Sequence, residues 1–513
     1  MKLERKKNAI RNIEIGVLNK TVTIICPFIL RTILIRELGT EYLGLGSLFT
    51  SILQVLNLTE LGMGSAMVFH LYRPIAEEDN RRICALVSLY KYVYRVIGLI
   101  ILLGGLLVLP FLPHFIHGQY PDDINIYFLY LLYLVNTVVS YFIASYRSTI
   151  LSAFQRRDII SMIGMAVHTG LYLMQIVCLL CFANYYVYVI WLPIFTIIEN
   201  IVTARYVKRK YSNFVKPETI DKQDIRFIFS SVKDLFGHKL SRVVVNSVDT
   251  IVISAFLGLQ MVTIYNNYYY LMSAVSGLLD IIYQAVLAGI GNSLVSERIE
   301  KNQKDFDKFT VLNLWLVGWC AICFLCLYQP MMELWMGETL MLGIETVLLL
   351  VVYFYVWKSR QTVLLYKDAA GLWAEDCLRP YAEIIVNLTI NILLVQIIGI
   401  NGVLISTILS MLFVSLPWET RVFFRRCLKC STRKYYLANL VCLALTFLAG
   451  TITFVICNFI PFSGIISFIL KIAICMIVPN VVIFCCGYRI PLYHETVRFV
   501  ASMIPVWGQR KDV

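Results

Sequence analysis

Residues 93–112 read VYRVIGLIILLGGLLVLPFL, an apolar run with a single charge, Arg95. A helix needs about 20 such residues to cross the hydrocarbon core of a bilayer, so this stretch predicts one membrane span. Similar runs recur along the chain, whose 513 residues are 59% hydrophobic and 15% charged. Soluble domains carry about 25% charged residues. The composition therefore predicts an all-α integral membrane protein. It argues against large soluble domains, a cleaved signal peptide and nucleic-acid binding.

We expect about 14 transmembrane helices. Their predicted ranges are 13–35, 42–69, 93–112, 124–146, 158–182, 187–204, 235–256, 263–290, 310–330, 343–366, 380–398, 403–420, 437–458 and 465–487. With a cytoplasmic N-terminus, the cytoplasmic segments hold 36 of the 45 Lys and Arg residues, and the outer connections hold only Arg36. Basic residues concentrate in cytoplasmic loops, so this asymmetry predicts that both termini are cytoplasmic.

A weak internal repeat divides the chain. A shift of 219 residues places Lys20 on Lys239 and the pair Leu38–Gly39 on Leu257–Gly258. Six helices return the chain to its starting side, so parallel repeats about an axis along the membrane normal are expected. The predicted parts are a six-helix lobe at 1–204, a basic cytoplasmic linker at 205–234, a pseudo-symmetric six-helix lobe at 235–420, and two extra helices with a tail at 421–513.

Several ionisable residues lie inside the predicted spans, where they usually face a bundle interior or a water-filled cavity. The cations predicted to line a cavity are Lys20, Arg31, Lys239 and Arg242. The carboxylates predicted to orient them or to couple ion movement are Asp249, Asp280 and Glu60. The open alternative is that these groups pair with each other and hold helices together.

Other polar residues and the cysteines in the spans give weaker indications of a functional site. Arg147, Glu199, Lys358 and Arg360 lie toward the predicted cytoplasmic ends of their helices, where long side chains can reach water by snorkelling. Most of the 15 cysteines lie in apolar runs, which favours free thiols packed as small hydrophobes. The spacings Cys178/Cys181 and Cys427/Cys430 lack a second ligand pair, so no metal or other cofactor is predicted.

Four patches carry a family resemblance. They are RTILIRELGTEYLGL at 31–45, LTELGMGSA at 58–66, NSVDTIVIS at 246–254, and KDAAGLW at 367–373 with Arg379-Pro and Asn387-Leu beyond it. These patches resemble bacterial polysaccharide-biosynthesis membrane proteins, the oligosaccharide-lipid flippases of the multidrug/oligosaccharidyl-lipid/polysaccharide exporter superfamily. The resemblance covers nearly the whole chain.

The resemblance implies a two-lobed bundle that alternates between inward-open and outward-open states. It implies export of a polyprenyl-diphosphate-linked oligosaccharide across the bacterial cytoplasmic (inner) membrane for O-antigen, capsule or exopolysaccharide. The matching cationic positions are Lys20, Arg31, Lys239 and Arg242. Expected partners are the anionic lipid-linked sugar, membrane lipids and H⁺ or Na⁺ as candidate coupling ions. A monomer is favoured, although the sequence does not fix the oligomeric state.

Two other functions stay open. A drug or organic-cation antiporter of the same superfamily would need uncompensated cavity carboxylates, whereas the predicted cavity balance is mildly cationic. A membrane glycosyltransferase or polymerase would usually need a sizeable water-exposed loop. The longest outer connections, 113–123 and 331–342, are short, so we predict a transporter and not an enzyme.

Overall fold

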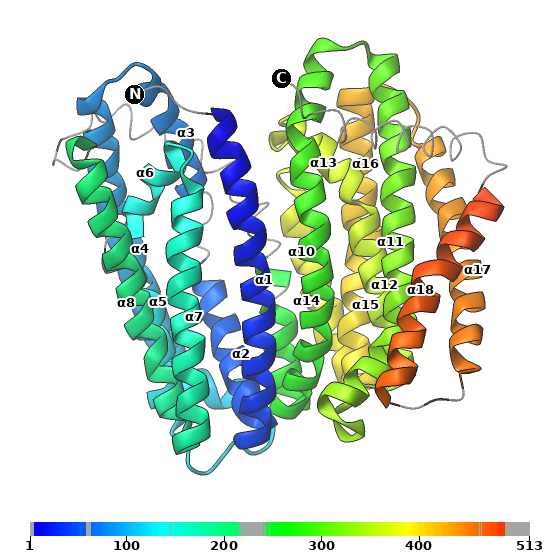
Figure 1. The fold of residues 1–513 in the computed structure, drawn as a ribbon, viewed down its shortest axis with the longest axis horizontal. Coiled ribbons are helices and arrows are strands. Elements are labelled where there is room, and N and C mark those ends of the chain that lie inside the picture. Colours follow the sequence, from blue (N-terminus) through cyan, green and yellow to red (C-terminus); the bar gives the residue numbers. More distant parts are fainter. Residues whose placement is uncertain are drawn as a thin grey trace. The chain divides into compact units, whose positions relative to one another are not determined.

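The computed structural model describes residues 5–57, 63–143, 145–214, 218, 240, 243–245, 247–460, 462 and 464–487. Every regular element in these ranges is a helix (Figure 1). Eleven of the described helices are long and apolar enough to cross a membrane, and two shorter apolar ones cover 126–142 and 243–257. The predicted all-α integral membrane fold is therefore confirmed.

The chain forms two compact units, residues 1–263 and 264–513. The predicted lobe boundary at 205–234 stays a prediction, because most of that linker lies outside the described residues. The first unit contains α1 Arg5–Glu37, α2 Thr40–Leu56, α3 Met63–Ala76, α4 Asn80–Val108, η2 Leu109–Phe115, α5 Ile126–Phe142, η3 Ser145–Arg147, α6 Ser148–Ala153, α7 Arg157–Phe182, α8 Tyr185–Lys210, η4 Ser212–Phe214 and the helix at 243–257.

Side-chain caps explain where three helices of the first unit begin. Asp79 accepts a hydrogen bond from the backbone N–H of Arg82 at the start of α4. Asn125 and Asn184 do the same at the starts of α5 and α8, each accepting from two backbone N–H groups. These caps satisfy donors that have no partner in the first turn of a helix.

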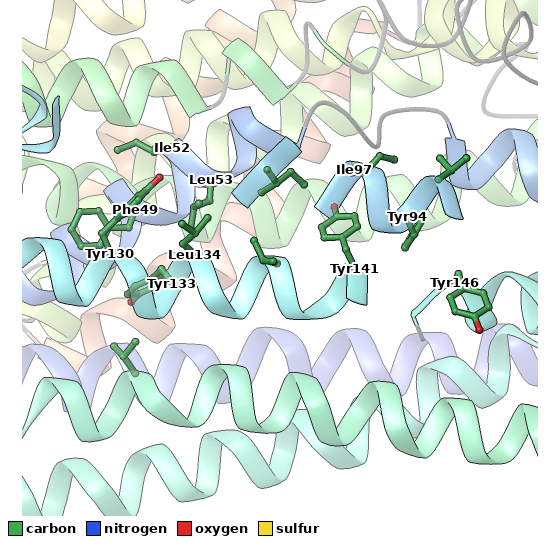
Figure 2. Close-up of a cluster of buried hydrophobic side chains, with 14 of the residues drawn as sticks. Phe49, Ile52, Leu53, Tyr94, Ile97, Tyr130, Tyr133, Leu134, Tyr141 and Tyr146 are labelled. Carbon is green, nitrogen blue, oxygen red and sulfur yellow. The ribbon is translucent and has the colours of Figure 1, made fainter. Parts of the chain in front are cut away.

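Aromatic packing joins α2 to α5 in the core of the first unit (Figure 2). Phe49 meets the rings of Tyr130 and Tyr133 edge-on, with centroid distances of 5.4 and 5.8 Å. Gly46 permits this approach, because a Cβ there would lie 2.6 Å from the Tyr185 hydroxyl and 2.7 Å from that of Tyr133. Small residues let helices approach closely in membranes.

Connections predicted to face outward meet at one end of the first unit. The Tyr42 hydroxyl donates to Asp123 Oδ1 at 2.6 Å. The backbone N–H of His117 donates to the carbonyl of Ser254 at 2.9 Å, next to the predicted outer end of the seventh helix. These contacts join three connections that are predicted to share a side.

Connections predicted to be cytoplasmic also meet one another. Arg11 Nε lies 2.7 Å from a carboxylate oxygen of Asp158. The Cys84 thiol donates to the carbonyl of Asn213 at 3.2 Å. Both sets of contacts agree with the predicted alternation of spans, while the cytoplasmic or outward orientation of each end stays a prediction.

The second unit begins within α10 and ends with two helices beyond the repeat. Its elements are α10 Leu259–Ser296, α11 Ile299–Met336, η5 Glu338–Leu340, α12 Ile344–Ser359, α13 Gln361–Ala369, η6 Ala374–Asp376, α14 Arg379–Ile398, α15 Ile400–Ser410, the π-helix η7 Met411–Ser415, α16 Leu416–Phe423, the π-helix η8 Phe424–Leu428, α17 Arg433–Asn458 and α18 Gly464–Gly487. Helices α17 and α18 pack on α11 (Figure 1), where Trp315 Nε1 donates to Asn480 Oδ1 at 3.0 Å.

Helix boundaries repeat along the chain with the predicted shift of 219 residues. The shift places Thr40, where α2 begins, on Leu259, where α10 begins, and Asn80 of α4 on Ile299 of α11. The glycines of both Leu-Gly turns adopt positive φ, +115° at Gly39 and +87° at Gly258. A residue with a Cβ is strained there, so glycine suits both turns. Two helix starts and the two Leu-Gly turns therefore recur at this shift.

Two predicted helices are interrupted. The range 343–366 is divided between α12 and α13 at Arg360. The range 42–69 contains α2 and α3, and the residues from 58 to 62 between them lie outside the described part of the chain. The range 403–420 contains α15, a π-helical segment and the start of α16. Pro417 sits in the first turn of α16, where its missing N–H favours such a local rearrangement. The sequence did not predict these interruptions, because the segments on either side of each one are equally apolar.

Two other helices extend beyond their predicted ranges. Helix α4 begins at Asn80 and not at residue 93, and α11 covers Ile299–Met336 in place of 310–330. Their additional first turns contain charged residues, which a search for apolar runs leaves out. These turns were missed because a membrane helix can continue past the hydrocarbon into water.

Candidate functional site

The first unit holds three of the predicted site residues that the structure describes. Lys20 and Arg31 are half-buried on α1, and Asp249 is 4% exposed on the helix at 243–257. Ser247 on that helix donates to Gln54 Oε1 of α2 at 3.2 Å. This contact joins the helix at 243–257 to α2. Lys239, Arg242 and Glu60 lie outside the described residues.

Several tyrosines lie close together in the first unit near Arg31 of α1. Tyr188 of α8 lies near Arg31 and stacks on Tyr185, with ring centroids 5.5 Å apart. The Tyr133 and Tyr185 hydroxyls are 3.0 Å apart. Phenol groups both donate and accept hydrogen bonds, so this region of the first unit suits a polar or anionic group better than an apolar one.

Asp280 of α10 forms an ion pair within the second unit. Lys358 Nζ lies 2.8 Å from Asp280 Oδ1, and the side chains are 2% and 52% exposed respectively. The ammonium also lies 4.5 Å from the centre of a Trp357 ring and 5.8 Å from that of Tyr283. Cation–π contacts of this length are favourable. Snorkelling, which the sequence left open for Lys358, is not seen here, because its amine is buried against a carboxylate and aromatic rings.

The side-chain amide of Asn313 helps to hold Lys358 in place. The Tyr283 hydroxyl donates to Asn313 Oδ1 at 2.6 Å, and Asn313 Nδ2 donates to the carbonyl of Lys358 at 3.0 Å. These bonds tie α10, α11 and α12 together around the ammonium. Lys358 is thus held in place, while the carboxylate of Asp280 stays half-open to its surroundings.

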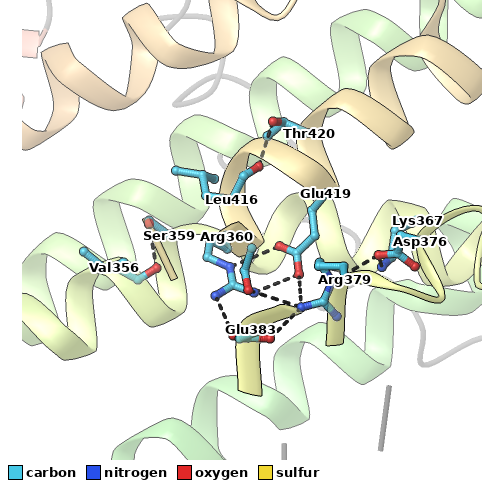
Figure 3. Close-up of polar contacts among 11 residues, drawn as sticks. Val356, Ser359, Arg360, Lys367, Asp376, Arg379, Glu383, Leu416, Glu419 and Thr420 are labelled. Atoms are coloured by element: carbon cyan, nitrogen blue, oxygen red, sulfur yellow. Dashed lines mark hydrogen bonds and ion pairs between the residues drawn. The ribbon is translucent and has the colours of Figure 1, made fainter. Parts of the chain in front are cut away.

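A larger network of buried charges lies nearby in the second unit (Figure 3). Its members come from the α12–α13 break, α13, η6, α14 and α16: Arg360, Lys367, Asp376, Arg379, Glu383 and Glu419. Arg360 binds Glu419 through two hydrogen bonds of 3.1 and 2.8 Å. Arg379 Nη1 reaches Glu383 at 2.8 Å and Glu419 at 3.2 Å. Lys367 pairs with Asp376, which also accepts a hydrogen bond from Arg379 at 3.2 Å.

The three cations and three carboxylates of this network balance formally. Buried charges require such pairing, because removal from water costs each ion several kcal/mol. Arg360, for which the sequence left snorkelling open, is therefore buried and paired. The sequence singled out Lys367 and Arg379 only as part of a resembling patch, and it missed Glu383 and Glu419. The spacing of four residues from Arg379 to Glu383 was the available signal.

Three thiols form a separate cluster in the second unit. The sulfur atoms of Cys326, Cys457 and Cys475 lie within 4.8 Å of one another, and all three residues are buried. Their neighbours on α11, α17 and α18 are mostly apolar. Binding a metal would require thiolates, whose charge is costly to bury, whereas neutral thiols pack well among apolar groups. We therefore assign these cysteines to packing.

The fold is similar to those of several solved membrane transporters. A structure titled lipid II flippase MurJ, in an inward closed conformation, matches with a TM-score of 0.64 at 13% identity, covering 93% of this chain and 98% of that one. An inward-facing MATE family multidrug resistance transporter matches with a TM-score of 0.61 at 14% identity, covering 81% and 98%. A transporter of the MOP superfamily from Pyrococcus furiosus, whose title reports a binding pocket of reverse polarity, matches with a TM-score of 0.53 at 13% identity, covering 83% and 97%.

No curated protein matches the sequence. The sequence profile described as polysaccharide biosynthesis protein matches residues 9–290. This match covers more than half of the 513 residues. The resemblance predicted from the four patches is confirmed, and the chain belongs to the polysaccharide biosynthesis protein family.

Proposed function

We propose that this protein is a flippase and not an enzyme. It moves a polyprenyl-diphosphate-linked oligosaccharide from the inner to the outer leaflet of a bacterial cytoplasmic membrane, for the synthesis of a surface polysaccharide. The family match at 9–290 is the observation that carries the proposal. The fold similarity to a lipid II flippase supports it.

The chemistry of the first unit is consistent with such a cargo. A diphosphate cannot cross hydrocarbon without replacing its lost hydration, and Lys and Arg side chains do this through charge-assisted hydrogen bonds. Lys20 and Arg31 lie about 16 Å apart along α1, at 1.5 Å per residue. We propose that they receive the diphosphate at two successive depths, together with Lys239 and Arg242.

Both termini are proposed to be cytoplasmic, which places Lys20 nearer the inner leaflet and Arg31 nearer the outer one. The lipid-linked cargo would then enter the cavity near Lys20 and leave it near Arg31. The proposed coupling ion is H⁺ or Na⁺. Asp249 is proposed to orient the cavity cations, and ion coupling is its alternative role. We favour a monomer that contacts only its cargo and membrane lipids.

Export of an organic cation is the competing function, and the embedded carboxylates favour it. Asp249 is buried and Asp280 is half-exposed, as a cation site would require. The ion pair with Lys358 at 2.8 Å neutralises Asp280, however, so that carboxylate offers no uncompensated charge. The anionic cargo therefore fits the described residues better.

Flipping by the purified protein in liposomes tests the proposal. A fluorescent polyprenyl-diphosphate sugar in the outer leaflet is quenched by an impermeant reagent, and the protected fraction reports flipping. We expect wild-type protein to flip this probe. The variant K20Q/R31Q should lose most of that activity.

R36Q is the matched control, because Arg36 is an exposed cation in the last turn of the same helix. It should flip the probe at the wild-type rate. If wild-type protein leaves the probe unflipped but expels ethidium along an imposed proton gradient, the cation-export function is correct. Full activity of K20Q/R31Q would reject the cationic path while leaving the flippase function intact.

A further inference from the structure

A cavity of about 830 Å³ lies along α16 in the second unit. Its lining includes Arg421, Arg425, Arg426, Trp418, Phe413 and Glu375. This volume lies in the range of small-molecule sites, about 300–1,000 Å³. A neighbouring cavity of about 620 Å³ shares Arg421 and Arg425. The two cavities also share Pro417, so they adjoin at one end of the helix.

This cavity is separate from the buried charge network, although α16 contributes to both. Glu419, Thr420 and Phe423 are buried on one side of α16. Trp418 and Arg421 contact the cavity from the other side. The helical repeat of 3.6 residues explains this division between two faces. The arginines of the cavity therefore have a role that the network does not account for.

The charges of the cavity are not balanced. Its lining has three arginines and one carboxylate, Glu375. Among the residues that the structure describes, no carboxylate lies within ion-pair distance of Arg421, Arg425 or Arg426. All three arginines are exposed. Arginine forks bind phosphate oxygens in pairs, so this cluster suits a phosphate group.

The cavity also has an apolar part, which lies away from the arginines along the helix. Phe413 is 74% exposed and lies several helical turns from Arg426 along the chain. Trp418 lies between these two levels, and tryptophan prefers the membrane interface. Phe413 thus reaches toward the hydrocarbon, whereas the arginines lie at the end of the helix that is predicted to be cytoplasmic.

We propose that this cavity binds an anionic phospholipid of the cytoplasmic leaflet, with its phosphate among the three arginines and an acyl chain along Phe413. Basic pockets at the cytoplasmic ends of membrane helices attract such headgroups. Apart from Glu375 and the arginines, the lining is apolar or aromatic and has no amide or hydroxyl side chain for a sugar. The site is therefore distinct from the proposed path of the glycan cargo and does not depend on it.

Native mass spectrometry of the purified full-length protein, titrated with cardiolipin, tests this site. Wild-type protein should retain a bound cardiolipin that phosphatidylcholine does not displace. In R421Q/R425Q/R426Q the affinity should fall about 100-fold, since each basic residue near a lipid surface contributes about a fivefold gain. F413A should weaken binding less and keeps every charge, which separates lipid binding from misfolding.

K208Q/R209Q/K210Q is the matched control, because these three exposed cations end α8 and the change in charge is the same. It should bind cardiolipin as wild type does. An equal loss in both triple variants would show bulk charge attraction only and would overturn the proposal. Displacement of cardiolipin by an equal concentration of polyprenyl diphosphate would assign the cavity to the transport cargo. Displacement by inorganic phosphate alone would overturn the contribution of the acyl chain.

Discussion

Glu419 is the residue on which the buried charge network depends most. Its carboxylate is fully buried and accepts two hydrogen bonds from Arg360. It also lies 3.2 Å from Arg379. The substitution Glu419→Gln keeps the size of the side chain and removes its charge. One of three carboxylates is then lost, and the network carries one uncompensated positive charge.

The expected cost follows from this imbalance. Removing one partner of a buried ion pair destabilises a protein by about 3–5 kcal/mol, because the remaining charge is left unpaired. Glu383 lies 4.0 Å from Arg360 and already pairs with Arg379 at 2.8 Å, so it compensates only in part. We expect Glu419→Gln to lower the free energy of unfolding by at least about 3 kcal/mol.

Reversible unfolding in mixed micelles, followed by tryptophan fluorescence, measures this free energy. The double variant R360Q/E419Q restores neutrality, so it should be more stable than the sum of its single variants. A coupling energy of about 1–3 kcal/mol between the two positions is expected for groups in direct contact. Surface expression of each variant should follow its stability.

Glu297→Gln is the matched control, since Glu297 pairs with Lys301 at 2.6 Å but both side chains are about half-exposed. Exposed pairs of this kind contribute little to stability, so no measurable change is expected. If Glu419→Gln is as stable as wild type, or if the double variant shows no coupling, the network does not depend on charge balance and the reasoning is wrong.

Three further predictions use other parts of the chain. Single cysteines at 113–123 should react with an impermeant thiol reagent from outside and those at 205–234 only after permeabilisation; the reverse pattern would invert the predicted topology. Gly44→Ala should destabilise the first unit by about 1–3 kcal/mol, because its Cβ would overlap a backbone oxygen at the start of α10, whereas Gly16→Ala meets open space and should not destabilise it. Asp249→Asn should keep downhill flipping in liposomes. If flipping by this variant no longer depends on an imposed pH gradient, Asp249 is the coupling site.

The sequence predicted the helices well because membrane spans obey a simple physical requirement. Each needs about 20 apolar residues, and the lipid offers its backbone no hydrogen-bond partners. The predicted run at 93–112 therefore lies within one candidate membrane span, Asn80–Phe115, which consists of α4 and η2. The same requirement does not specify where a helix breaks. The break at Arg360 appears only in the backbone of the structure, where α12 ends at Ser359 and α13 begins at Gln361.

The sequence predicted the candidate site less completely. Asp280 was identified as an embedded carboxylate, but its pairing with Lys358, for which the sequence left snorkelling open, was not predicted. The two residues are 78 positions apart, and a single sequence contains no sign of such a pairing. Glu419 was missed for the same reason, because its partner Arg360 is 59 positions away. Local spacing reveals charges on one helix, whereas pairing depends on which helices meet.

The short segment from Lys358 to Arg360 links two different electrostatic environments. Residues two apart on a helix point in widely different directions, about 200° apart at 3.6 residues per turn. Lys358 binds the half-exposed Asp280 of α10, while Arg360 binds Glu419 of α16 in the buried network. The end of α12 is thereby held from two sides by charge. Since Arg360 also marks the break between α12 and α13, ion pairs stabilise the second unit at a point where the backbone helix is interrupted.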